Sequence, residues 1–197
     1  MVLMVRTRTM STIVFLDTRG EKLPKAAREA VTYASQLAGG PVTAVTFGDA
    51  QGLETLGAQG AGKVIVARGL KTVDGQQLTR LVADVATKEH ADTIVCVHDA
   101  TGKTVAPRVA VRLKAGHVAG VTGLPEGGLF RRNVFSGKAR AFVEVKSPVK
   151  VLSLMPNSIA VGTGTNSATV EEYAGDPGPG RITVKEVRKA GSGVPLP

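Results

Sequence analysis

The residues best suited to hold a ligand follow a short apolar run near the middle of the chain. After residues 93–97 comes the polar segment 99–104, Asp-Ala-Thr-Gly-Lys-Thr. A Gly-containing loop between a strand and a helix presents N–H groups and a lysine to a phosphate. The residues predicted to contact a phosphate are Thr101, Gly102, Lys103, Thr104 and, on the following helix, Arg108. A structural helix start or a partner contact explains the same segment, and the sequence favours these over a bound phosphate.

The histidines, Ser136 and the single cysteine lack the neighbouring residues that a metal site or a catalytic nucleophile requires. His90, His98 and His117 have no paired carboxylate or cysteine near them, so no metal site is predicted. Ser136 stands outside a G-x-S-x-G motif and is predicted to lie in a hairpin turn. The single cysteine, Cys96, lies within an apolar run, which predicts an unreactive core thiol and fits a reducing compartment.

The first half of the chain alternates between apolar runs and amphipathic stretches. Apolar runs at 12–16, 42–47, 63–67 and 93–97 are typical of buried parallel strands. Helical spacing follows at 24–37, at 74–90 and after 104, where Pro107 is expected in the first turn. This alternation predicts an α/β fold with a mostly parallel, Rossmann-like three-layer sheet. No GxGxxG follows the first strand, and no P-loop is present.

The second half has a different pattern, with strands and no helices. A short strand is expected at 118–121, and strands at 129–135, 139–146 and 149–155 are predicted to form an antiparallel β-meander that closes the sheet. Residues 156–180 are rich in Gly, Pro, Asn, Ser and Thr and are predicted to be a linker, with a last strand at 181–188. We therefore expect an α/β domain at 11–155 and a linker with one extra strand at 156–197.

The net charge of the chain, taken with its composition, indicates which kind of partner it binds. The formal net charge is +9, but aromatic residues are only 4% of the chain and the basic residues are scattered rather than gathered in one block. This argues against nucleic acid and for an acidic protein partner. The predicted hairpin carries Arg131, Arg132 and Lys138 beside apolar residues, and these three are the predicted partner-binding residues. No apolar run approaches ~20 residues, so no membrane insertion is expected.

Three segments, in order, carry a family resemblance. TGKTVAPRVAVRLKAGHVAGVTGL at 101–124, FRRNVFSGKARAFVEV at 130–145 and KVLSLMPNS at 150–158 resemble the amino-terminal domain of the electron transfer flavoprotein alpha subunit. The opening STIVFLDTRGEKLPKAAREAVTYASQLA at 11–38 is similar to the first strand and helix of that domain. The resemblance implies an adenine-nucleotide-hydrolase-like fold for this chain.

The resemblance also implies a role. The chain would be an electron-carrier subunit rather than an enzyme, a scaffold in a heterodimer with the beta subunit. That heterodimer carries FAD and passes electrons from acyl-CoA or other dehydrogenases, as in fatty acid β-oxidation, to a respiratory acceptor. In the family a second domain holds the FAD, and this sequence stops about where it would begin, so we expect no FAD on this chain alone. The bacterial cytoplasm is expected before the mitochondrial matrix. A stand-alone nucleotide-binding α/β module is the alternative, and a nucleic-acid binder is a weaker one.

Overall fold

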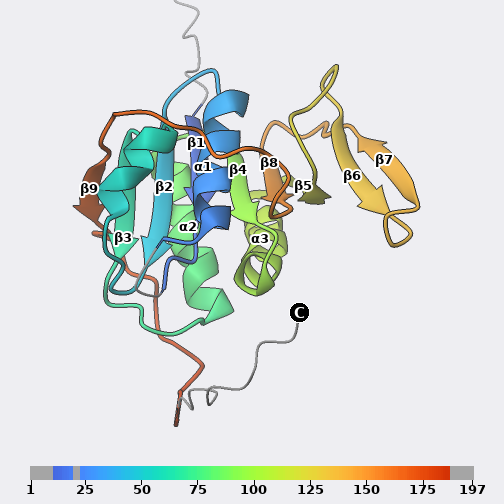
Figure 1. Cartoon of the computed structure of the whole chain (residues 1–197). Helices are drawn as coiled ribbons and strands as arrows, with labels where there is room; N and C mark the ends of the chain where they lie inside the picture. Colours follow the sequence, from blue (N-terminus) through green and yellow to red (C-terminus); the bar gives the residue numbers. More distant parts are fainter. Residues whose placement is uncertain (1–10, 20–22, 187–197) are drawn as a thin grey trace, which may run out of the picture.

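The computed structural model describes residues 11–19 and 23–186, and the strands of these residues form one nine-stranded sheet (Figure 1). Its order is β7-β6-β5-β8-β4-β1-β2-β3-β9. The strands are β1 Ser11–Phe15, β2 Val42–Phe47, β3 Lys63–Ala67, β4 Ala91–Val97, β5 Gly116–Val121, β6 Phe130–Val134, β7 Ala139–Val143, β8 Lys150–Leu154 and β9 Thr169–Glu172. The helices are α1 Lys25–Leu37, η1 Leu53–Gln59, α2 Gly75–Lys88 and α3 Ala100–Leu113.

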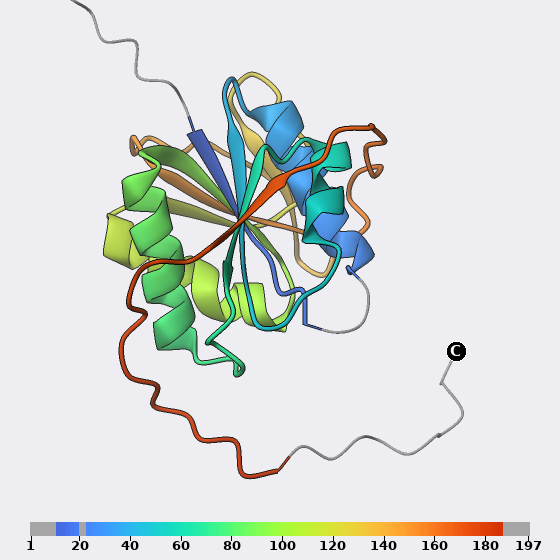
Figure 2. The same cartoon turned by 90° about the vertical axis from the view of Figure 1, so that its left-hand side faces the viewer.

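The sheet has helices on both faces, as the alternating pattern predicts. Figure 2 shows α1 and η1 on one face and α2 and α3 on the other. Each layer encloses its own apolar core, and strands β1, β2 and β4 are buried along their whole length. Strands apolar on both faces need cover on both, which is why the fold is three-layered. The predicted α/β, mostly parallel, Rossmann-like fold is confirmed. No helix in the described part of the chain is long and apolar enough to cross a membrane.

The predicted β-meander is only partly correct. Strands β5, β6 and β7 pair antiparallel, but β8 lies between β4 and β5 and runs parallel to both. The reason is burial: Val151, Leu152, Ser153 and Leu154 are all buried, whereas β7 is half-buried or exposed throughout. A strand buried on both faces belongs inside the parallel sheet, not at its antiparallel end.

The predicted last strand is also misplaced. Residues 181–186 form no strand, and 187–188 lie outside the described residues. The extra strand is β9, within the expected linker, and it pairs parallel with β3. Every residue of β9 is exposed, so no hydrophobic alternation marks it in the sequence. Backbone bonds fix both of its ends, from the N–H of Ala168 to Glu54 O at 2.9 Å and from that of Tyr173 to Val66 O at 2.9 Å.

Candidate functional site: the carboxyl ends of β1 and β4, and the β6–β7 hairpin

The segment predicted to be a phosphate-binding loop is the first turn of α3. The helix starts at Ala100, and the side chain of Asp99 caps it by accepting a hydrogen bond from the N–H of Gly102 at 2.7 Å. The N–H of Lys103 donates to Asp99 O at 2.9 Å. The expectation of a loop is therefore wrong, because an Asp at this position caps a helix as well as it opens a loop. Pro107 lies inside the helix rather than in its first turn.

Two of the predicted phosphate contacts are used inside the protein. The hydroxyl of Thr101 is buried and donates to Asp17 Oδ2 at 2.7 Å. A Cβ on Gly102 would overlap the carbonyl oxygen of Val97, so this glycine allows α3 to pack directly on the end of β4. Both residues are therefore explained by packing and internal bonding.

The other three predicted phosphate contacts do not point to one common site. The hydroxyl of Thr104 turns back to Ala100 O at 3.0 Å. Lys103 is exposed, and its charge acts on His98. The methyl group of Thr104 and the guanidinium of Arg108 both lie beside Gly75, at the start of α2. The structure therefore does not gather the five residues around one ligand-sized space.

The strand order reverses between β1 and β4, and sheets of this class hold their ligands at the carboxyl ends of the strands at such a point. Here that position is occupied by Asp17. Arg19 donates to its two carboxylate oxygens at 2.8 and 2.7 Å and lies over the ring of Phe47 at 5.3 Å. Burial would raise the pKa of Asp17, but the hydrogen bonds from Arg19 and Thr101 outweigh it and the pKa is lowered. Because the guanidinium of Arg19 is already paired with this carboxylate, the described residues at this position offer no unpaired cation to the diphosphate of FAD.

A cluster that sequence reasoning missed lies at the ends of β4, β5 and β8. His98 Nδ1 and Ser153 Oγ are hydrogen-bonded at 2.9 Å. Burial lowers the pKa of His98, and the charges of Lys103 and Arg132 lower it further. Burial likewise lowers the pKa of His117, and its Nε2 is buried without a partner. Only the parallel pairing of β8 beside β4 brings these residues together, and that pairing is not visible in the sequence.

Metal binding finds no support in the described residues. Among them, no group of three or more His, Cys, Asp or Glu side chains could hold a metal ion. Cys96 is fully buried, and burial raises the pKa of its thiol to about 12. The predicted core position of this thiol is confirmed, and its lack of reactivity stays a prediction that the raised pKa supports.

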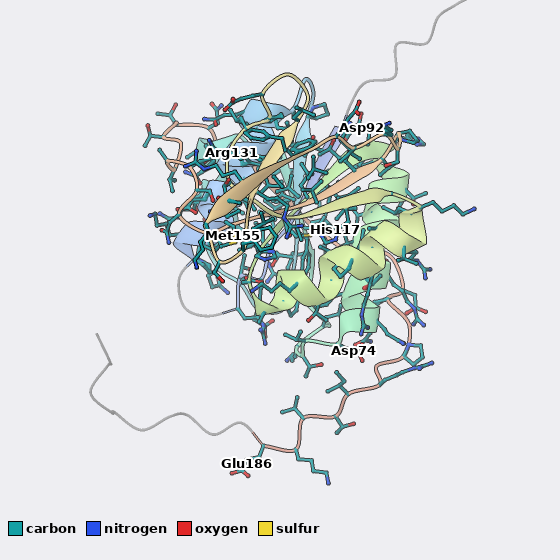
Figure 3. The ribbon with its side chains drawn as sticks, turned by 90° about the vertical axis from the view of Figure 1, so that its right-hand side faces the viewer. Asp74, Asp92, His117, Arg131, Met155 and Glu186 are labelled. Atoms are coloured by element: carbon teal, nitrogen blue, oxygen red, sulfur yellow. The ribbon has the colours of Figure 1, made fainter. Side chains whose placement is uncertain are left out.

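The predicted partner-binding residues lie on β6 and in the turn between β6 and β7, two strands that extend the sheet beyond the helices (Figure 1). Adjacent strand residues point to opposite faces, so Arg131 and Arg132 do not form one cluster. Arg131 donates to Thr122 O at 3.0 Å, and Lys138 is exposed in the turn. Figure 3 labels Arg131 and views the molecule from the side of this hairpin.

The outer face of the hairpin carries exposed aromatic side chains. Phe142 pairs with Arg131 across the strands and is 54% exposed. We call the residues of this side the hairpin face: Arg131, Asn133, Arg140 and Phe142. Phe135, in the turn, is 80% exposed and has a positive φ of 50°. An aromatic residue in the left-handed region is strained, and such strain concentrates at functional sites.

Comparison with known proteins places the chain in a family. Residues 12–177 match the electron transfer flavoprotein domain. The chain is 28% identical over 195 residues to the electron transfer flavoprotein subunit alpha of Bacillus subtilis, covering 93% of this chain and 60% of that one. It is also 28% identical over 183 residues to the probable mitochondrial electron transfer flavoprotein subunit alpha of Cryptococcus neoformans, covering 84% of this chain and 51% of the relative. The chain thus spans between half and two thirds of the length of these relatives. Because the match covers most of its residues, the chain belongs to the electron transfer flavoprotein family.

Proposed function

We propose that this chain is the amino-terminal domain of an electron transfer flavoprotein alpha subunit. In this role it is the scaffold of an FAD-containing heterodimer that passes electrons from dehydrogenases to a respiratory acceptor. The match over residues 12–177 and the similarity to proteins named alpha subunits support the proposal. The redox chemistry would be that of the flavin, so the chain acts as a carrier subunit and not as an enzyme.

The observation that carries the scaffold role is the aromatic surface of the β6–β7 hairpin. The whole chain has five Phe residues, and two of them, Phe135 and Phe142, are exposed on this hairpin. Large aromatic side chains are enriched in the cores of protein interfaces, where they contribute most of the binding energy. We propose that the beta subunit covers the hairpin face and the turn beside it.

The charge of the hairpin suggests the chemistry of the partner surface. Arg140 lies on the hairpin face, Lys138 lies in the turn, and both are exposed. Basic residues around an apolar centre favour a partner with acidic groups at matching positions, which speeds association more than it tightens it. Arg131 is less free to pair with a carboxylate of the partner, because two of its N–H groups donate to Thr122.

The cofactor is proposed to lie elsewhere in the heterodimer. The carboxylate of Asp17, held between Arg19 and Thr101, stands where a sheet of this class would place a diphosphate. We therefore propose that the isolated chain is colourless. The phosphate contact predicted for Thr101–Thr104 stays a prediction, and the internal bonds of Thr101 and Thr104 do not favour it. A bacterial cytoplasmic location is proposed from the single buried, reduced cysteine.

Association with a beta subunit from the same genome tests the proposal. Light scattering of the mixture is expected to give the mass of one chain of each kind. Phe142→Ala should weaken this association by about 30-fold or more, the effect typical of an aromatic interface anchor. Ile182→Ala is the matched control, since Ile182 is also 54% exposed but lies after β9. Equal effects of the two substitutions, or no complex at all, would contradict the proposal.

A further inference from the structure

A groove of about 620 Å³ lies between α2 and α3. Arginines from three parts of the chain line it: Arg80 of α2, Arg108 and Arg112 of α3, and Arg181 after β9. Figure 2 shows the chain after β9 running alongside α2. The groove is separate from the hairpin face and from the carboxyl ends of β1 and β4.

Helical spacing explains why the arginines converge. On α3, Val105 and Val109 are buried against the sheet, which leaves Arg108 and Arg112 on the outer face. On α2 the same pattern turns Arg80 toward α3. Residues three or four positions apart lie on one side of a helix, so each helix presents its cations along the same groove.

The positive charge of the groove is not neutralised within the described chain. No ion pair there joins any of these arginines to a carboxylate. The nearest candidate, Asp74, is buried, and its carboxylate accepts the N–H groups of Gln76, Gln77 and Arg181 instead. Asp84 is bonded to Lys88 at 2.9 Å and to the hydroxyl of Tyr173 at 2.8 Å. Asp176, which lines the adjoining pocket with Arg80 and Arg112, accepts the N–H of Gly178 at 2.7 Å. These three acids therefore form hydrogen bonds with other groups, and the four arginines leave an excess of positive charge.

The side chain of Arg108 on α3 reaches the start of α2. A Cβ on Gly75, the first residue of α2, would lie 3.2 Å from Arg108 Nη1, so this guanidinium lies against the amino terminus of α2. The carboxylate of Asp74 caps this end of α2 by accepting the N–H groups of Gln76 and Gln77, so it offsets the partial positive charge of the helix terminus. Arg80 is held in place by the bond from its Nη1 to Pro177 O at 3.2 Å. An anion in the groove would offset the mutual repulsion of the four guanidinium groups that line it.

We propose that the α2–α3 groove binds a small molecule through its diphosphate group, with Arg108 and Arg112 as the main contacts and Arg80 and Arg181 beside them. The planar guanidinium donates two parallel hydrogen bonds to phosphate oxygens, which favours phosphate among anions. Val111 is the one apolar side chain lining the groove in the described chain, and no aromatic residue lines it. A protein partner normally needs an aromatic or similarly large anchor, so a small ligand fits better.

Titration calorimetry with inorganic pyrophosphate at low ionic strength tests the site. Arg108→Gln and Arg112→Gln are each expected to weaken binding about tenfold or more, equivalent to about 1.4 kcal/mol. Arg140→Gln removes the same charge from β7, outside the groove, and should leave the affinity within about twofold. ADP should bind with similar affinity and show the same losses, because the diphosphate is the shared group. Melting curves of each variant verify folding, which the exposure of both arginines favours.

Several results would overturn the assignment. One is the absence of heat from pyrophosphate and ADP alike. Another is equal weakening by Arg140→Gln, which would show that only the overall charge matters. Loss of binding in Lys103→Ala with full binding in Arg112→Gln would move the site to the start of α3. Binding of polyglutamate without binding of pyrophosphate would make the groove a protein contact instead. Because the inference does not use the beta subunit, its failure leaves the proposed function standing.

Discussion

Replacing Phe135 with glycine should change stability and partner binding in opposite directions. Phe135 has a φ of 50° and is 80% exposed, so it contributes little to the core. Its conformation is unfavourable for a residue with a Cβ, and glycine adopts it without that penalty. The same substitution removes an aromatic side chain from the proposed interface.

The size of the effect follows from two opposing contributions to the free energy of unfolding. Relief of the left-handed conformation is worth roughly 1–2 kcal/mol. The greater freedom of glycine in the unfolded chain removes roughly 0.5–1 kcal/mol of that gain. The net increase in the free energy of unfolding is therefore about 0.5–1 kcal/mol, which raises the Tm of a chain of this length by about 1–4 °C.

The assay compares Phe135→Gly with Ser136→Gly. Ser136 is the next residue of the turn, is exposed and has a similar φ of 54°, but it carries no aromatic ring. Both variants should melt at a higher temperature than the parent chain in scanning calorimetry. Only Phe135→Gly should weaken association with the beta subunit, by about tenfold or more if the ring is buried there.

Three results would refute this reasoning. A lower Tm for Phe135→Gly would show that the ring stabilises the isolated chain by more than the backbone strain destabilises it. Unchanged association of Phe135→Gly with the beta subunit would show that the turn lies outside the interface. Equal weakening by Ser136→Gly would attribute the effect to backbone flexibility and not to the aromatic side chain.

The remaining predictions concern the core and the first turn of α3. Gly102→Ala should destabilise the chain by roughly 3 kcal/mol or more, because the added Cβ would overlap the carbonyl of Val97. Lys103→Ala should change the free energy of unfolding by about 0.5 kcal/mol or less. Chemical denaturation measures both variants, and equal effects would contradict the packing account. Cys96→Ser should lower the free energy of unfolding by roughly 1–3 kcal/mol if the new hydroxyl is unpaired. The parent thiol should react with a thiol reagent at neutral pH only after unfolding, so rapid labelling of the native chain would count against its burial. Burial lowers the pKa of His98 and His117 in the folded chain. As the pH falls through the ordinary histidine pKa of 6.5, the unfolded chain therefore binds more protons than the folded chain. The free energy of unfolding should be highest above pH 6.5 and should decline below it. A His98→Gln, His117→Gln double variant should flatten this decline in Tm, and an undiminished slope would assign it to other groups.

The central sheet is the part of the fold that the sequence predicts best. Continuous apolar runs such as that of β4 are buried on both faces, and their alternation with amphipathic stretches leaves one class of fold. Strand order is harder, because β8 sits next to β4 only through long-range packing that no local pattern records. The strand β9 escaped prediction because it uses its backbone against β3 while its side chains remain exposed.

For the candidate sites too, local sequence patterns predicted some features, and long-range packing decided the others. The sequence identified the hairpin and its basic residues, but strand pairing decides that Arg131 and Arg132 face opposite ways. In the sequence, Asp99 could belong either to a ligand-binding loop or to a helix cap, because aspartate is common at both positions. Only the backbone conformation in the structure shows that it caps α3. The arginine-lined groove depends on how α2 packs against α3, so its members stand far apart in the chain, from Arg80 to Arg181.

Hydrogen exchange of the chain, alone and mixed with the beta subunit, tests the central claim most directly. The claim is that this domain is a scaffold that pairs through the β6–β7 hairpin. We expect slower exchange of backbone amides within residues 130–143 on mixing, with little change in α2 and α3 away from that hairpin. Unchanged exchange across residues 130–143 in a mixture that forms a complex by light scattering would contradict the account.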